Sequence, residues 1–262
     1  MLLVEDPPVD VATPTGPMRT YRYRPAPERR YPGVVLYSEI YQRTAPIHRI
    51  AQILAGHGFV VAVPEIFHDL EPAGRVLGYD TDGTARGNAC KVGKPVAAYD
   101  ADARATLDML AAWPACTGAL GTVGVCIGGH LAFRCAMQPD VRAAACFYAT
   151  DIHKGSLGAG GDDSLARAAD IRGELLMVWG RQDPHIPDDG RAAIYRRLVD
   201  ARCRFTWHEY EAQHAFLRDE GPRYDPALAL TGYRLAIDLF QRKLGEGDLS
   251  SEAGAPGRET RH

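Results

Sequence analysis

The chain has 262 residues, 46% of them hydrophobic and 24% charged, as is ordinary for a globular protein long enough to bury a large core. The net charge of −3 gives no reason to expect a nucleic acid or an anionic membrane as a partner, and no stretch approaches the ~20 apolar residues of a membrane span. The first residues lack the basic start and the apolar core of a signal peptide, so we expect a cytoplasmic protein.

Strand and helix patterns alternate from the start of the chain. Two segments of alternating polarity around a Pro-Thr-Gly-Pro turn, residues 9–13 and 18–24, predict an antiparallel hairpin at a sheet edge. Continuous apolar runs predict buried strands at residues 33–38 and 59–63. Between these two runs, apolar residues at helical spacing predict a helix over residues 47–56.

Residues 65–95 differ from the segments before them. Glycine, aspartate and proline punctuate this stretch, and no hydrophobic period is sustained, so we expect a long irregular connection. A connection of this length inside a compact domain usually has a function.

The remaining segments continue the alternation. Residues 151–169 are glycine-rich and acidic and predict a loop with one helical turn. The other patterns predict, in order, a helix at 99–113, strands at 121–125, 141–148 and 174–179, a helix at 189–199, a strand at 203–210 and a helix at 226–244.

This order predicts one α/β domain over residues 1–244, with a doubly wound, mostly parallel sheet and helices on both faces. Residues 245–262, rich in Gly, Ser, Glu and Arg, are expected to form a disordered tail.

Cys126 stands between a predicted strand and a predicted helix, in the run Gly124-Val-Cys-Ile-Gly128. This pattern resembles the nucleophile elbow of α/β-hydrolases, with cysteine in the serine position. Glycine is needed two positions before and after the nucleophile because strand and helix press together there and leave no room for a β-carbon. The alternative interpretation is a glycine-rich turn with a buried cysteine.

Other reactive residues follow predicted strands, where the functional groups of such a sheet gather. Glu39 follows the strand at 33–38, Asp183 the strand at 174–179, and His214 the strand at 203–210. Cys126, Asp183 and His214 have the chain order of an α/β-hydrolase triad. In that interpretation His214 is the base that forms the thiolate, and Asp183 orients His214.

Two backbone amides would stabilise the oxyanion of an acyl-transfer reaction. The elbow supplies the amide of Ile127, and the loop after the strand at 33–38 should supply a second amide, that of Ile40.

Each assignment has an alternative. Asp183 could be a turn former, with Asp188 and Asp189 as rivals, although Asp189 has the place of a helix N-cap. His185 is a weaker candidate for the base. The six cysteines show no metal-binding spacing and are expected to be free thiols.

Four motifs together resemble the dienelactone hydrolase (carboxymethylenebutenolidase) family: Ser38-Glu-Ile40, Gly124-Val-Cys-Ile-Gly-Gly129, Gly180-Arg-Gln-Asp183 and Gln213-His-Ala-Phe216. The resemblance implies hydrolysis of an enol-lactone or activated ester through an acyl-thiol intermediate, without a metal or cofactor. It also implies that Glu39 contacts the resting thiol and takes its proton when substrate arrives.

The same resemblance implies that two arginines bind a carboxylate of the small-molecule lactone or ester substrate. Arg218, four residues after His214, matches one of them. The second falls in residues 65–95, where this sequence departs from the bacterial pattern, and Arg86 or Arg75 could replace it. The chain is expected to be a monomer or a small homo-oligomer.

Two other functions are compatible with the same motifs. One is a general carboxylesterase or thioesterase on this scaffold. The other is a non-catalytic α/β-hydrolase-fold protein that binds a ligand or partner.

Overall fold

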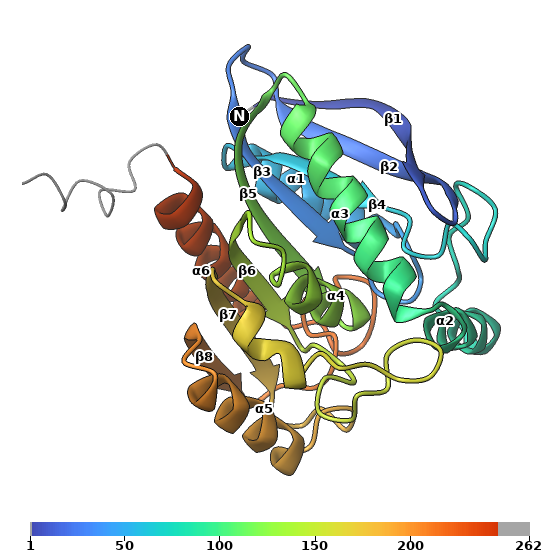
Figure 1. The fold of residues 1–262 in the computed structure, drawn as a ribbon, viewed down its shortest axis with the longest axis vertical. Helices are drawn as coiled ribbons and strands as arrows, with labels where there is room; N and C mark the ends of the chain where they lie inside the picture. Colours follow the sequence, from blue (N-terminus) through green and yellow to red (C-terminus); the bar gives the residue numbers. More distant parts are fainter. Residues whose placement is uncertain (1, 246–262) are drawn as a thin grey trace, which may run out of the picture.

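The computed structural model of the protein describes residues 2–245, within which eight strands form one sheet (Figure 1). The strands are β1 (Leu3–Thr13), β2 (Gly16–Pro25), β3 (Tyr31–Tyr37), β4 (Val60–Pro64), β5 (Cys116–Val125), β6 (Val141–Phe147), β7 (Glu174–Gly180) and β8 (Arg204–Tyr210). Their order in the sheet is β1-β2-β4-β3-β5-β6-β7-β8. The hairpin β1–β2 joins β4 antiparallel, and every later pair in this order is parallel.

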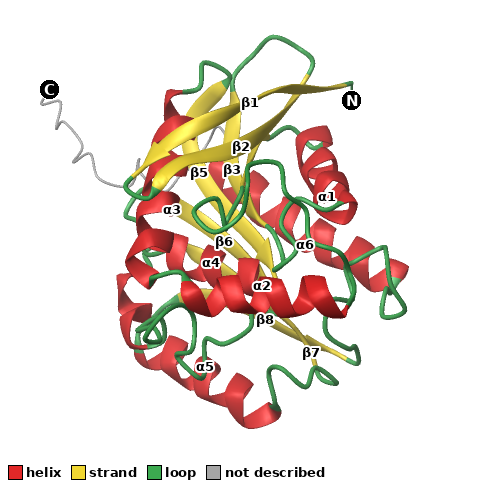
Figure 2. Ribbon diagram, turned by 90° about the vertical axis from the view of Figure 1, so that its right-hand side faces the viewer, coloured by secondary structure: helices red, strands yellow, loops and turns green. Residues whose placement is uncertain are grey.

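Six α-helices accompany the described strands: α1 (Ala45–Gly56), α2 (Thr81–Gly93), α3 (Val96–Ala112), α4 (Ile127–Cys135), α5 (Asp188–Asp200) and α6 (Pro226–Leu244). Figure 2 shows α1 and α6 on one face of the sheet and α3, α4 and α5 on the other. The predicted doubly wound, mostly parallel sheet with an N-terminal antiparallel hairpin is therefore confirmed. None of the helices in residues 2–245 has the length and apolar character needed to cross a bilayer.

The central strands are covered on both faces, which explains their continuous apolar runs. All five residues of β4 are buried, and so are the consecutive apolar residues Val34, Val35 and Leu36 of β3. The sheet therefore forms a rigid core, and its parallel strands direct their carboxyl ends to one edge.

The expectation of an irregular segment at 65–95 is wrong in part, because α2 lies inside it. Asp80 caps this helix, its side chain accepting a hydrogen bond from the amide of Gly83 at 2.7 Å. The buried residues of α2 are only Gly83, Gly87 and Cys90, so the helix has no apolar stripe to give a helical period. By contrast, residues 151–169 form the expected loop, with one short 3-10 helix at Ala166–Asp170.

The expected disordered tail, residues 245–262, lies outside the described residues except for Gly245. The helix before it, α6, has the predicted bounds.

Candidate active site

Cys126 stands at the sharp turn between β5 and α4, with φ 60° and ψ −125°. Such backbone angles are unfavourable for a residue with a β-carbon and persist only where the surroundings impose them. A β-carbon added at Gly124 would lie 1.9 Å from the carbonyl oxygen of Gly128, and one at Gly128 would lie 2.3 Å from that of Tyr37. The glycines therefore let strand and helix close around the turn and hold the half-buried Cys126 at the end of β5.

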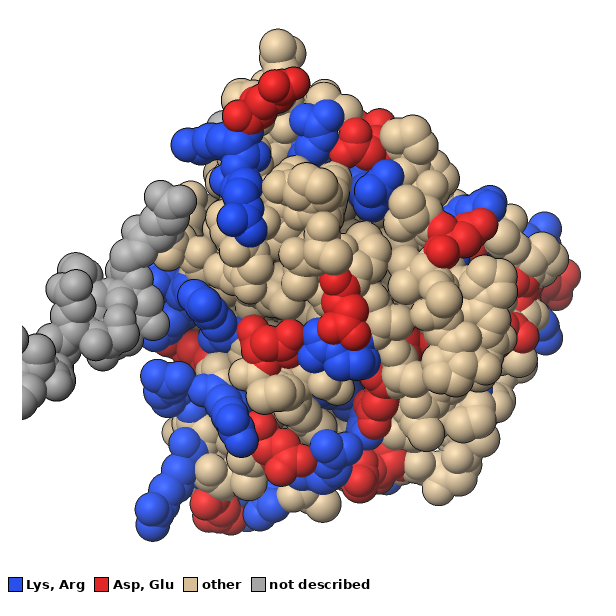
Figure 3. Space-filling model, turned by 45° about the horizontal axis from the view of Figure 1, so that its top comes forward, with Lys and Arg blue, Asp and Glu red and all other residues tan. Residues whose placement is uncertain are grey.

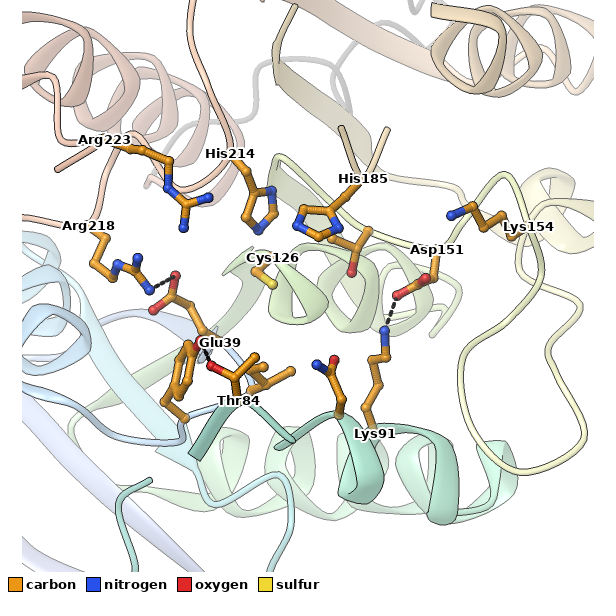
Figure 4. Close-up of a pocket in the computed structure, with 14 residues that line it drawn as sticks. Glu39, Thr84, Lys91, Cys126, Asp151, Lys154, His185, His214, Arg218 and Arg223 are labelled. Atoms are coloured by element: carbon orange, nitrogen blue, oxygen red, sulfur yellow. Dashed lines mark hydrogen bonds and ion pairs between the residues drawn. The ribbon is translucent and has the colours of Figure 1, made fainter. Parts of the chain in front are cut away.

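A cavity of about 280 Å³ opens at this turn and is lined by Cys126, Glu39, His214 and Arg218, among others (Figure 4). Ile40, in the turn after β3, lines the same cavity. Ile127 is the first residue of α4, so its amide has no acceptor within the helix. Of the two residues expected to supply oxyanion amides, Ile127 thus follows Cys126 directly in the sequence, and Ile40 lies at the same cavity.

His214 and Asp183 form a buried pair beyond the ends of β8 and β7. Nδ1 of His214 and Oδ2 of Asp183 are 2.6 Å apart, and both residues are at most 6% exposed. Tyr148 packs edge-on against the His214 ring, with ring centroids 5.1 Å apart, and Phe216 supports Tyr148 at 5.0 Å. Packing and the carboxylate together fix the plane of the imidazole.

Opposing effects act on the pKa of His214. Burial favours the neutral ring, but the negative charge of Cys126 and hydrogen bonds with Cys126 and Asp183 favour the charged ring more strongly. The net effect raises the pKa of His214 to about 10. A charged imidazole in contact with a sulfur atom is an electrostatic arrangement that stabilises a thiolate.

Glu39 is buried in the wall of the cavity beside these groups. Its Oε2 accepts a hydrogen bond from the Tyr79 hydroxyl at 3.2 Å, and its Oε1 lies 4.0 Å from Nη1 of Arg218. Burial raises the pKa of Glu39, while the charges of Arg218 and His214 and the Tyr79 hydrogen bond partly oppose this rise. The carboxyl is thus poised to hold or release a proton inside the cavity.

Arg218 is held by aromatic rings as well as by charge. Its guanidinium carbon lies 4.4 Å from the ring centroid of Tyr79 and 5.9 Å from that of Tyr41. This stacking keeps the planar fork at the cavity wall, where it can receive a carboxylate.

The structure does not bring Arg86 to the cavity. Arg86 pairs with Glu71 and donates to the carbonyl of Leu70 at 2.8 Å, and half of its side chain is exposed on the outer side of α2. Arg75, the other candidate, is also exposed and does not line the cavity. A helix rather than a loop at 81–93 turns Arg86 away, because Thr84, Asn88 and Lys91 occupy the side of α2 that lines the cavity.

The structure also shows where the alternative candidates for the catalytic acid and base lie. Asp188 and Asp189 lie in the first turn of α5, where Asp188 contacts Arg191, and Pro187 rather than Asp189 is the N-cap. His185 lines the cavity and packs edge-on against His214, with ring centroids 4.7 Å apart.

Four further charged residues line the cavity, and the sequence analysis did not single them out: Lys91, Asp151, Lys154 and Arg223. They belong to α2, to the loop after β6 and to the segment between His214 and α6. The strand-end rule could have found Asp151, which follows β6, but it does not point to the three cations. Asp80, the cap that starts α2, was the available signal for the helix that carries Lys91. In residues 2–245, no cluster of three or more His, Cys, Asp or Glu side chains could hold a metal ion.

Comparison with known proteins agrees with the fold. Residues 18–244 match the sequence model of the Dienelactone hydrolase family. A Saccharomyces cerevisiae protein provisionally named carboxymethylenebutenolidase is 40% identical over 248 residues, which cover 90% of each chain. The carboxymethylenebutenolidase of a Pseudomonas species is 25% identical over 216 residues, covering 81% of this chain and 85% of the relative.

A similar solved structure, from Klebsiella pneumoniae and provisionally described as a dienelactone hydrolase, superimposes with a TM-score of 0.81. It covers 92% of this chain and all of that one at 22% identity, a likeness of fold. The family match spans nearly all the described residues. The chain therefore belongs to the dienelactone hydrolase family and is a hydrolase that acts on ester bonds.

Proposed function

We propose that this protein is a cysteine hydrolase that opens an enol-lactone or an activated, carboxylate-bearing ester through an acyl-thiol intermediate. The observation that carries the proposal is the meeting of Cys126 at a glycine-flanked turn with the buried His214–Asp183 pair at one cavity. No metal or cofactor is required by this chemistry.

Once substrate has bound and the thiol has lost its proton, the reaction proceeds from Cys126 as thiolate and His214 as imidazolium. The sulfur attacks the carbonyl carbon, and the amides of Ile127 and Ile40 stabilise the oxyanion that forms. Collapse of this intermediate breaks the bond to the leaving oxygen, which takes the proton from His214. His214 then takes a proton from water as the hydroxyl attacks the thioester, and the sulfur leaves as thiolate. Asp183 keeps the imidazole in the orientation that both proton transfers need.

Glu39 would control when the thiolate forms. In the resting site, Nη1 of Arg218 lies 4.0 Å from Oε1 of Glu39, so the positive charge of Arg218 stabilises the Glu39 carboxylate. A substrate carboxylate bound to Arg218 would compete for that charge and thereby raise the affinity of Glu39 for a proton. Glu39 could then accept the proton of a resting thiol, so that the reactive, oxidation-sensitive anion forms when substrate is present.

The decisive test replaces the sulfur. Cys126→Ala should lower kcat/KM for a dienelactone or an activated ester by at least about 10³-fold while leaving circular dichroism unchanged. Mass spectrometry of the wild type quenched during turnover should find the acyl group on Cys126. Cys203→Ala is the matched control, because Cys203 is also half-buried but donates to the carbonyl of Ala168 at 3.2 Å, outside the cavity.

Undiminished turnover by Cys126→Ala would refute the mechanism. Labelling of Cys126 by iodoacetamide with no turnover of any ester would instead indicate a binding protein that retains the fold of a hydrolase.

A further inference from the structure

The cavity beside Cys126 is more positive than the protein that contains it. Four cations line it, namely Lys91, Lys154, Arg218 and Arg223, against the two carboxylates Glu39 and Asp151. The whole chain, by contrast, has a net charge of −3. A recess with an excess of positive charge attracts anions, since its low-dielectric walls strengthen the field inside.

The cations form two groups on opposite sides of the cysteine. Figure 4 shows Arg218 and Arg223 on the Glu39 side of Cys126, and Lys91 and Lys154 on the Asp151 side. One carboxylate bound between the two arginines would leave the lysine side of the cavity without an anionic ligand.

On the lysine side, one cation is paired and one is free. Nζ of Lys91 donates to Oδ2 of Asp151 at 2.8 Å, and both side chains are largely buried. Lys154, three residues further along the same loop, makes no ion pair within residues 2–245. Lys154 is exposed to solvent and lines the cavity. This end therefore has a net positive charge of one, with Asn88 of α2 nearby as a neutral hydrogen-bond donor.

We propose that Lys154 and Lys91 form a second anion subsite, so that the preferred substrate carries two acidic groups, one on each side of the ester bond that Cys126 attacks. The proposal rests on the proposed function, because it places the scissile bond at Cys126. The arginine side takes one carboxylate and the lysine side the other, which positions the carbonyl between them.

Asp151 limits the strength of this subsite. Burial disfavours its charge, but the hydrogen bond and charge of Lys91 outweigh burial and lower the pKa of Asp151. Asp151 therefore stays ionised, orients Lys91 and opposes any incoming anion. Its backbone has φ 69°, a conformation that asparagine also tolerates, so Asp151→Asn can remove the charge with little backbone strain.

The experiment measures a selectivity ratio. A dianionic ester, with one carboxylate on the acyl part and one on the alcohol part, is compared with its two monoanionic analogues, in which either carboxylate is replaced by a carboxamide. The ratio is kcat/KM for the dianion divided by kcat/KM for the better monoanion. In the wild type we expect a ratio well above one.

Two variants should shift this ratio in opposite directions. Lys154→Gln should lower it about fivefold, as expected for the loss of one exposed ion pair, and Lys154→Arg should restore it. Asp151→Asn should raise it, because it frees Lys91 and removes the opposing charge. Lys243→Gln is the control, since it removes the same charge from α6, where Lys243 pairs with Glu174 at 3.1 Å.

A wild-type ratio of one or less, or a ratio that Lys154→Gln and Asp151→Asn leave unchanged, would overturn the subsite. Turnover of the monoanions that still requires Cys126 would then show that only the subsite has failed. If no ester is turned over, or if Cys126→Ala retains full activity, the proposed function itself fails.

Discussion

His214 and His185 are neighbouring histidines whose pKa values are shifted in opposite directions. Burial, followed by the positive charge of His214, lowers the pKa of His185 below its usual value of 6.5. His214 is buried more deeply than the exposed His185, yet burial fails to lower its pKa, because Cys126 and Asp183 supply compensating negative charge. Contacts with the sulfur and the carboxylate therefore raise the pKa of one ring, while the pKa of the ring packed against it is lowered.

This contrast leads to a prediction about the Cys126→Ala variant. Without the sulfur anion, burial weighs more heavily, so the pKa of His214 should fall from about 10. The pKa of His185 should rise, because a neutral His214 no longer repels its proton. Imidazole NMR titration of the two residues checks both signs. A His214 pKa that is the same with and without the sulfur would contradict the thiolate–imidazolium pair.

The helix α2 forms one wall of the cavity although it buries almost no apolar side chain. Gly87 lies against the turn that carries Ile40, and the Thr84 hydroxyl lies 2.9 Å from that of Tyr41. Lys91 connects the far end of the helix to Asp151. Polar contacts and close backbone approach therefore hold α2 over the site, in place of an apolar stripe.

Close packing of α2 predicts that Gly87→Ala impairs catalysis. A β-carbon at Gly87 would lie 2.6 Å from the carbonyl oxygen of Ile40 and 2.9 Å from its Cβ, so Ile40 must shift. Since Ile40 is the proposed second oxyanion donor, kcat should fall by about 10²-fold with a smaller change in KM. Steady-state kinetics on an activated ester measures the two parameters.

Gly93→Ala is the matched control in the same helix, because the nearest atom to its β-carbon, Cδ1 of Leu70, is 4.0 Å away. It should leave kcat unchanged. Equal loss of activity in both variants would point to general disturbance of α2 rather than to displacement of Ile40.

The same helix shows where inference from the sequence stops. Periodic apolar residues predicted α1, α3 and α6, since these helices bury side chains against the sheet. The face of α2 that packs closest contains Gly83 and Gly87, and a glycine contributes no hydrophobic signal. The role of α2 as a cavity wall depends on the close fit of Gly87 against the turn after β3, which exists only in the folded chain.

At the scale of the whole molecule, the parallel sheet brings distant residues to one edge. Glu39, Cys126, Asp183 and His214 follow β3, β5, β7 and β8, so their grouping could be predicted from their positions just after strands of a mostly parallel sheet. The cations Lys91, Lys154 and Arg223 come from a helix and from long connections, whose course strand order does not determine. The grouping of the strand-end residues was therefore more predictable than the positions of the cations.

The distribution of charge over the molecule distinguishes the cavity from the surface. On the face drawn in Figure 3, basic and acidic side chains lie next to one another over much of the surface. The described ion pairs, such as those of Arg104 with Asp108 and Asp140, balance charge locally. Attraction of an anionic substrate must then come from the cavity rather than from the net charge of −3.

This arrangement predicts that the effect of salt on kcat/KM depends on the charge of the substrate. Raising the salt concentration from about 0.02 M to about 0.5 M shortens the screening length from roughly 20 Å to roughly 4 Å and should lower kcat/KM for a carboxylate-bearing ester several-fold. A neutral ester of the same alcohol should show little change. Arg223→Gln should weaken the salt dependence, because Arg223 lines the cavity and makes no ion pair within residues 2–245.

The Arg196→Gln variant distinguishes attraction of the substrate by the cavity cations from attraction by the net charge of the protein. Arg196 is exposed on α5, away from the cavity, so this change makes the chain more negative by one charge without altering the charge near Cys126. If the cavity attracts the substrate, Arg196→Gln should keep the wild-type salt dependence while Arg223→Gln loses part of it. Equal effects of both variants would assign the attraction to the net charge, and an equal salt response of neutral and anionic esters would exclude a role for the cavity cations in binding.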